Sequence, residues 1–83
     1  MEFNQVLDNI RVYVLKSAGS HVSEIDDDTK LFHEGYFDSI RLVSLIAFLE
    51  ENYAFQISDD DMMEENFGSI ASISQYVMAK LKN

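Results

Sequence analysis

The chain has 83 residues, of which 47% are hydrophobic and 25% are charged. This length supports one small domain spanning residues 1–83, and the composition is that of a folded globular protein rather than a disordered one. Fifteen acidic residues against six basic ones leave a formal net charge of -9 at pH 7. That charge argues strongly against a nucleic-acid partner, because phosphate binding relies on Lys and Arg. The absence of cysteine excludes disulfides, a thiolate nucleophile and any cysteine-ligated metal.

Two features of the chain bear on its location. The N-terminus has no basic region followed by an apolar run, so no secretory signal peptide is predicted. The longest mostly apolar stretch, residues 42–49, is far too short to span a bilayer. We therefore expect a cytoplasmic protein that does not insert into membranes.

Residues 2–18 predict an amphipathic helix, because apolar side chains recur at three- and four-residue spacings while charged ones fall largely on the other side. Gly19 is expected to end this helix, since glycine tolerates the left-handed conformation that closes many helices. The apolar positions of the helix are Phe3, Val6, Leu7, Ile10, Tyr13 and Val14.

Residues 20–38 show no sustained period and predict a long loop. A loop of this length is unusual in so small a domain, where it indicates either a function or a misassigned element. Isolated apolar residues are expected to anchor it to the core, namely Val22, Ile25, Leu31, Phe32, Tyr36 and Phe37.

A second helix is predicted from residue 38 or 39 to about residue 52, and either Asp38 or Ser39 can cap the free N–H groups at its start. We centre its buried face on Leu49 and step about 100° per residue. The residues that then fall within about 60° of Leu49 form a complete core stripe, consisting of Leu42, Leu45, Ile46 and Tyr53.

The opposite face of this second helix is unusually apolar. It carries Ile40, Val43 and Ala47, beside Glu50 and Glu51. An exposed apolar stripe rimmed by carboxylates indicates a partner-binding surface. The alternative is that the long loop folds over these residues and buries them, and periodicity alone does not distinguish the two.

Two further helices complete the prediction. Ser58, with Asp61 three residues later, resembles a capping arrangement for a short third helix over residues 59–66. Gly68 is expected to interrupt the helical conformation, and Ser69 is expected to cap a fourth helix. The apolar face of that fourth helix consists of Ile70, Ile73, Val77 and Leu81. The predicted fold is therefore all-α, a small bundle of three main helices and one short helix with a long loop between the first two.

The sequence offers no catalytic or metal-binding group. His21 and His33 lie in the loop without metal-ligand spacing around them, so both are expected to be solvated. The acidic runs at residues 26–28 and 59–61 do not follow the spaced pattern of the helix–loop–helix calcium site, which needs Gly at its sixth position and Glu at its twelfth. We predict no metal site and no enzymatic activity.

Ser39 is the one hydroxyl whose position suggests chemistry. A helix N-terminus favours negative charge, so a phosphodiester on this hydroxyl would lie against free backbone N–H groups. No base neighbours Ser39 in the sequence. Another enzyme would therefore have to modify it, because a self-activated nucleophile needs such a base. The alternative is that Ser39 is only a helix cap.

Residues 31–40, with the sequence LFHEGYFDSI, resemble the attachment-site signature of the acyl carrier protein family. In that signature an apolar residue, a Gly and an Asp-Ser-apolar triplet open the second helix. The resemblance extends over nearly the whole chain, to residues 25–31 (IDDDTKL), residues 48–53 (FLEENY) and residues 67–73 (FGSIASI). Together with the length, the acidity and the helix order, these segments favour an attachment role for Ser39 over a plain cap.

The resemblance implies a carrier protein and not an enzyme. A phosphopantetheinyl transferase would join the 4′-phosphopantetheine arm of coenzyme A to Ser39, and the thiol of that arm would hold acyl intermediates as thioesters. Asp38 would shape the cap and take part in recognition by the transferase. The carrier is expected to be a monomer that meets enzymes with basic docking surfaces in weak, salt-sensitive encounters. Its docking face would consist of Ile40, Val43, Ala47, Glu50 and Glu51.

Two positions depart from the family pattern. Arg41 and Ser44 stand where carriers of fatty acid synthesis usually have acidic residues. This favours a dedicated partner set, in lipid, polyketide or other specialised biosynthesis, over housekeeping fatty acid synthesis. The single Gly35 before the attachment motif is closer to stand-alone acyl carriers, and to the stand-alone D-alanyl carrier group, than to peptidyl carrier domains. With no linker at either end, the chain is expected to be a discrete protein.

Three alternatives to an acyl carrier stay open at this point. The cargo could be an amino acid, as in a discrete aminoacyl or D-alanyl-type carrier. The chain could be an unmodified acidic helical interaction domain in which Ser39 is a plain cap. It could also be a divalent-cation-binding regulator.

Overall fold

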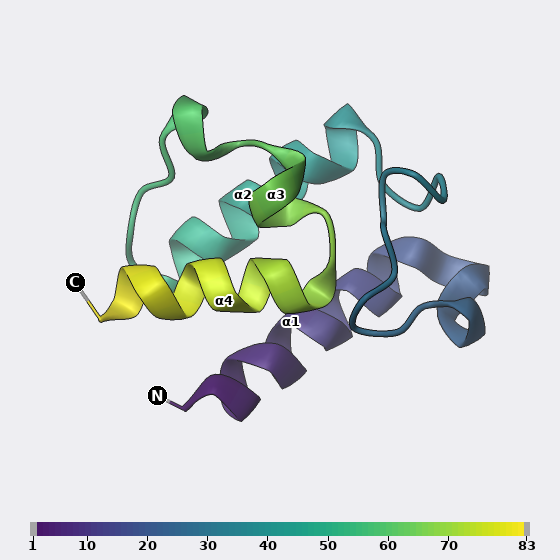
Figure 1. The fold of residues 1–83 in the computed structure, drawn as a ribbon, viewed down its shortest axis with the longest axis horizontal. Coiled ribbons are helices and arrows are strands. Elements are labelled where there is room, and N and C mark those ends of the chain that lie inside the picture. The colour runs from purple at the N-terminus through teal and green to yellow at the C-terminus, as the bar shows by residue number, and fades with distance from the viewer. Residues whose placement is uncertain (1, 83) are drawn as a thin grey trace.

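The computed structural model describes residues 2–82, without the side chains of residues 20–22. No strand occurs in this part of the chain, and none of its helices is both long and apolar enough to cross a membrane. The predicted all-α fold of three main helices and one short helix is confirmed (Figure 1). The elements, with two short 3-10 helices labelled η, are α1 (Phe3–Ala18), η1 (Gly19–Glu24), α2 (Ser39–Tyr53), η2 (Asp59–Asp61), α3 (Glu64–Phe67) and α4 (Ile70–Leu81).

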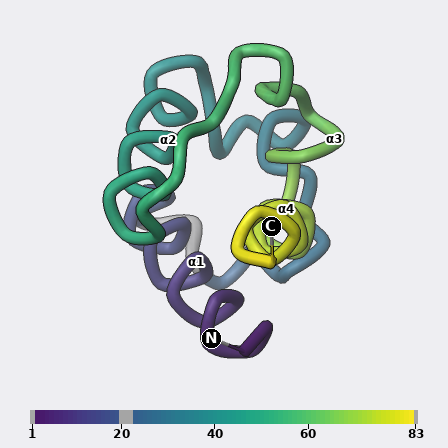
Figure 2. Tube along the Cα trace, turned by 90° about the vertical axis from the view of Figure 1, so that its left-hand side faces the viewer, coloured from purple at the N-terminus to yellow at the C-terminus, as the bar shows by residue number. Residues whose placement is uncertain are grey.

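The three long helices enclose the core. α1 packs mainly against α4, and Figure 2, which looks along α4, shows α1 and α2 on one side of it. Burying each aliphatic side chain contributes roughly 1.5–3 kcal/mol relative to leaving it exposed. The fully buried aliphatic residues that the long helices contribute are Val6, Ile10, Val14, Leu45, Leu49, Ile70, Ile73 and Val77.

The ends of the long helices follow the predicted signals. Gly19 follows α1 with a positive φ of 65°. Asp38 caps α2 by accepting a hydrogen bond from the N–H of Arg41, and Ser69 caps α4 by accepting one from the N–H of Ser72. Each cap satisfies a backbone donor that has no partner within its helix.

The predicted third helix over residues 59–66 is wrong in its extent. The chain forms η2, then two residues outside any helix, and only then the short helix α3. Ser58 makes no capping hydrogen bond through its side chain. The carboxylate of Asp61 instead accepts a hydrogen bond from the Tyr76 hydroxyl of α4 at 2.7 Å. This tertiary contact holds η2 against α4, and local capping chemistry does not reveal it.

Two apolar residues at helix ends are more exposed than predicted. Phe3, the first residue of α1, is 37% exposed, and Leu81, the last residue of α4, is 38% exposed. Both lie on the predicted apolar faces, but at the outer turn of their helices. A periodic pattern marks the face of a helix that is buried and not how far along the axis the burial continues.

Two carboxylates hold irregular segments to the helices. Asp27 accepts two hydrogen bonds from the Arg11 guanidinium, at 3.0 and 2.8 Å, and these lower the pKa of Asp27. The hydrogen bond from Tyr76 lowers the pKa of Asp61. A carboxylate whose pKa is lower in the folded state stabilises the fold above its unfolded-state pKa, about 3.9. That contribution is lost as the pH falls through the folded-state pKa.

Asp61→Asn should therefore lower the urea midpoint of unfolding at pH 7. The gap between the variant and the parent should shrink as the pH is lowered below the unfolded-state pKa of an aspartate, about 3.9, because Asp61 of the folded parent then becomes protonated. Urea titrations at several pH values measure this difference. Asp60→Asn removes the exposed neighbouring carboxylate and should not lower the midpoint at pH 7. Equal midpoints for the parent and Asp61→Asn at pH 7 would contradict a stabilising role for the Tyr76 contact.

Candidate functional site

Ser39 is the first residue of α2, and it is exposed. Asp38 precedes it in an extended conformation, with φ -132° and ψ -173°. The Asp38 carboxylate accepts the N–H of Arg41 at 2.9 Å, and the Asp38 carbonyl accepts the N–H of Leu42 at 2.9 Å. Of the two residues predicted to cap this helix, Asp38 is therefore the cap, and the Ser39 hydroxyl is not used for that purpose.

The turn before Ser39 is held by the backbone of Leu31. The Leu31 N–H donates to the carbonyl of Gly68 at 2.8 Å, and the Leu31 carbonyl accepts the N–H groups of Tyr36 and Phe37 at 2.9 and 3.1 Å. The side chains of Leu31 and Phe37 are 0% and 4% exposed. These contacts tie the residues that lead into α2 to the junction between α3 and α4, and so position Ser39.

The predicted loop between the first two helices is confirmed except for η1, a short 3-10 helix that the sequence analysis does not predict. The rest of this loop also packs against the helices. The Asp27 side chain binds Arg11 of α1, and the Asp27 carbonyl accepts the N–H of Ala71 of α4 at 2.9 Å. Val22 lies outside the described side chains. The other predicted anchors are buried or half-buried against the core, as expected for Ile25, Leu31, Phe32, Tyr36 and Phe37.

The face of α2 opposite the core is open to solvent. Ile40 is 78% exposed and Val43 is 69% exposed, and Ala47 is also exposed. The long loop therefore does not fold over this face, and of the two interpretations of the apolar stripe only the exposed one fits the structure. Apolar residues that lie together in solvent at helical spacing are typical of surfaces that bind a partner.

The two carboxylates predicted to rim this stripe differ in their surroundings. Glu51 is exposed. Glu50 is half-buried, and its carboxylate accepts the backbone N–H of Ile57 at 2.8 Å. Glu50 thus holds the segment after α2 in place, and a substitution there would disturb the fold as well as any partner contact.

Within the part of the chain that the structure describes, the Ser39 hydroxyl has no activating group beside it. Among the described residues, none forms a hydrogen bond with this hydroxyl. His33 lies 3.2 and 3.0 Å from the two carboxylate oxygens of Glu64 on α3. The side chain of His21 lies outside the described residues. A serine nucleophile needs an adjacent base to activate it, and the described side chains place none within hydrogen-bond distance of the Ser39 hydroxyl.

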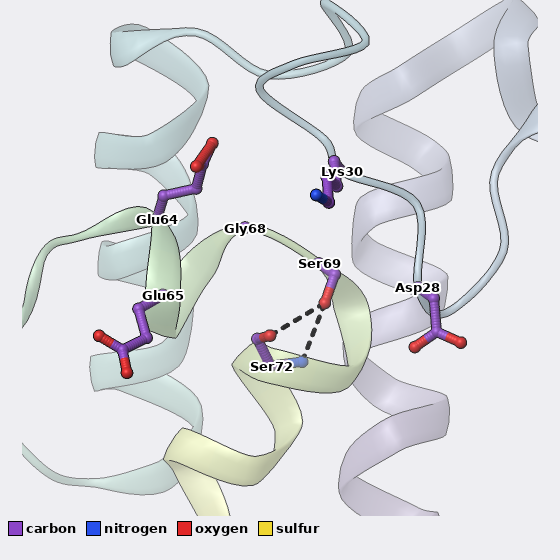
Figure 3. A pocket seen from close by; sticks show the side chains of 7 residues that line it. All are labelled: Asp28, Lys30, Glu64, Glu65, Gly68, Ser69 and Ser72. Atoms are coloured by element: carbon purple, nitrogen blue, oxygen red, sulfur yellow. Dashed lines mark hydrogen bonds between the residues drawn. The ribbon is translucent and has the colours of Figure 1, made fainter.

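A polar hollow of about 340 Å³ lies at the junction of α3 and α4 (Figure 3). Its carboxylates, from Asp28, Glu64 and Glu65, point in different directions. The hydroxyl of Ser69 accepts the N–H of Ser72 and also bonds the hydroxyl of Ser72, each at 3.1 Å. Over the described residues, no group of three or more His, Cys, Asp or Glu side chains is arranged to hold a metal ion.

A second, apolar hollow of about 150 Å³ lies between α2, α3 and the long loop. It is lined by Phe32, Leu42, Met62, Met63, Glu64 and Phe67. The sequence marked Phe32 and Leu42 as core residues, but the two methionines fall between η2 and α3 and showed no periodic signal.

The chain is similar to known proteins over most of its length. The family model for a phosphopantetheine attachment site matches residues 10–77. The acyl carrier protein of Chlamydia trachomatis serovar D is 26% identical over 73 residues, which cover 88% of this chain and 92% of the relative. That of Chlamydia felis is 25% identical over 73 residues, covering 88% and 91%. Because the family match spans most of an all-helical chain, this protein belongs to the acyl carrier protein family, as its attachment-like motif predicted.

Proposed function

We propose that this protein is an acyl carrier whose Ser39 hydroxyl bears a 4′-phosphopantetheine arm. A phosphopantetheinyl transferase would supply the arm from coenzyme A, with magnesium. The Ser39 oxygen would form a bond to the phosphorus that carries the pantetheine, adenosine 3′,5′-bisphosphate would leave, and the hydroxyl proton would pass to a base of the transferase. The observation that carries the proposal is the exposed Ser39 hydroxyl, free of hydrogen bonds within the described chain, at the first residue of α2.

The position of Ser39 suits a phosphodiester. Backbone N–H groups in the first turn of a helix have no intrahelical partners, and the helix dipole favours negative charge there. Asp38 uses its carboxylate on one of these donors, the N–H of Arg41, so the cap stays formed whether or not Ser39 is modified. We assign Asp38 to this cap and to recognition by the transferase.

The lack of cysteine fits a carrier of this kind. The arm would supply the thiol that holds an acyl group as a thioester, and the protein would present that group to the enzymes of a lipid, polyketide or other specialised pathway. Ile40, Val43 and Ala47 would form the apolar contact with such enzymes. Glu51 would face a basic group on the partner, with Glu50 contributing from a more buried position.

The proposal is tested by the intact mass of the protein before and after incubation with coenzyme A, magnesium and a broad-specificity phosphopantetheinyl transferase. The parent should gain one phosphopantetheine and Ser39→Ala none. Ser44→Ala removes another exposed serine of the same helix, and it should gain the arm as the parent does. Circular dichroism confirms that each variant is folded. No gain on the folded parent would leave Ser39 as a surface residue of an unmodified interaction domain.

A further inference from the structure

The part of α2 from residue 39 to residue 49 differs in charge from the protein as a whole. The chain carries a net charge of -9, yet residues 39–49 include no Asp or Glu. Arg41 is the one charged residue among them. A cation in the first turn of a helix opposes the helix dipole, so the dipole does not favour Arg41 at this position.

Arg41 lies on the side of α2 that faces α1. Its Nε donates to the carbonyl of Ser17 near the end of α1, at 3.3 Å, and its Nη1 lies 3.5 Å from the Asp38 carboxylate. The contact with Ser17 is at the long end of the hydrogen-bond range. The Arg41 side chain remains 48% exposed, which leaves part of its charge accessible to a docked partner.

The same side of α2 continues toward α1, where two aromatic rings meet. Tyr13 of α1 stacks on Phe48 of α2, with ring centroids 4.3 Å apart. Beside them is a hollow of about 320 Å³, lined by Asn9, Val12, Tyr13, Lys16, Phe48 and Asn52. Its only charged residue is Lys16, and Val12 is 53% exposed. Arg41 together with these six residues is named here the α1–α2 flank.

We propose that the α1–α2 flank selects the enzymes that dock at Ser39. It fits a partner enzyme that presents a carboxylate and an apolar group to this side of α2, and it repels one that presents a cation there. Complementary charge gives selectivity mainly through the rate of association and through like-charge repulsion. This inference rests on the proposed attachment function of Ser39.

The test uses a phosphopantetheinyl transferase whose docking surface is basic, and it measures kcat/KM for loading. Arg41→Glu should raise this value about three- to tenfold at low salt, and the gain should shrink in 0.5 M NaCl because salt screens the interaction. Lys82→Glu produces the same change in net charge at the far end of the chain, where Lys82 is exposed. This control should change kcat/KM much less. Equal gains for the two variants would overturn the proposal, because net charge alone would then explain them.

Two more substitutions separate charge from structure. Arg41→Lys keeps the charge but loses the guanidinium geometry, so it should load like the parent, whereas Arg41→Gln should load faster. If Arg41→Lys behaved like Arg41→Gln, the contact with Ser17 would be the cause and the proposal would fail. Lys16→Glu should also raise kcat/KM, since it reverses the second cation of the flank.

A charge exchange completes the experiment. The transferase is also varied, by single Lys→Glu or Arg→Glu substitutions on its docking surface. At least one of these transferase variants should have a higher kcat/KM for loading the parent carrier than for loading the Arg41→Glu carrier. An unchanged preference across all of these variants would overturn the proposal. A parent that is never loaded would instead refute the attachment function itself, so the two failures are distinguishable.

Discussion

Leu31→Ala is expected to lower the free energy of unfolding by about 2–5 kcal/mol, the range for removing a fully buried leucine side chain. Leu31 is 0% exposed, and its backbone groups join the turn before Ser39 to Gly68. Small domains have total stabilities near the lower end of about 5–15 kcal/mol. The variant should therefore be partly unfolded at moderate temperature, as measured by urea or thermal denaturation.

Leu81→Ala is the matched control for this prediction. It deletes the same atoms from a side chain that is 38% exposed at the end of α4. Its cost should be well below that of Leu31→Ala, because a partly exposed side chain leaves no closed cavity when it is shortened. Similar losses at the two positions would show that Leu31 is not the anchor of the turn.

Gly68→Ala is expected to destabilise the protein by about 1–3 kcal/mol, the usual cost of overpacking. A Cβ atom at this position would lie 2.5 Å from the backbone carbonyl oxygen of Glu64. Backbone cannot move aside as the end of a flexible side chain can, so α3 would have to shift relative to α4. The φ of Gly68 is -79°, which alanine adopts freely. If a Cβ at position 68 did not meet the Glu64 carbonyl oxygen, Gly68→Ala would stabilise the folded protein by about 0.4–1 kcal/mol, because alanine reduces the conformational freedom of the unfolded chain.

Gly35→Ala tests a different requirement for glycine, namely a backbone conformation with positive φ that other residues rarely adopt. Gly35 has a φ of 82°, and nothing lies within 4 Å of a Cβ placed there. Its substitution should cost about 1–2 kcal/mol through the left-handed conformation alone. Urea titration of both variants gives the two free energies, and thermal denaturation checks their order. A stabilising effect of Gly68→Ala would contradict the close approach to Glu64.

Under the proposed function, the two charged ends of α2 would act on a docked partner separately. Arg41 and Glu51 are ten residues apart, which corresponds to about 15 Å along the helix at a rise of 1.5 Å per residue. At physiological ionic strength the Debye length is about 8 Å. The net charge of -9 would therefore steer a partner enzyme over long range mainly at low salt. Each end of α2 would make its own local contact once a partner enzyme has docked.

Hydrophobic periodicity and local capping chemistry predicted most of the fold. The apolar spacing in the first, second and fourth helices reports which face is buried, and it marked Ile10, Leu49 and Ile73, all of which are fully buried. Asp38 and Ser69 cap helices within three residues of their partners. Such signals are readable from sequence because the interacting groups are neighbours along the chain. The attachment-like motif around Ser39 is local for the same reason.

What the sequence by itself determined is therefore the helical class, the core faces, most helix ends and the position of Ser39 at the start of α2. Only the tertiary structure decided that Ile40 and Val43 stay exposed, since that depends on where a distant loop packs. It also decided that Glu50 bonds the backbone of Ile57 and that Asp61 bonds Tyr76. These contacts form only when the helices are assembled, because burial and long-range hydrogen bonds depend on neighbours in space and not on spacing along the chain.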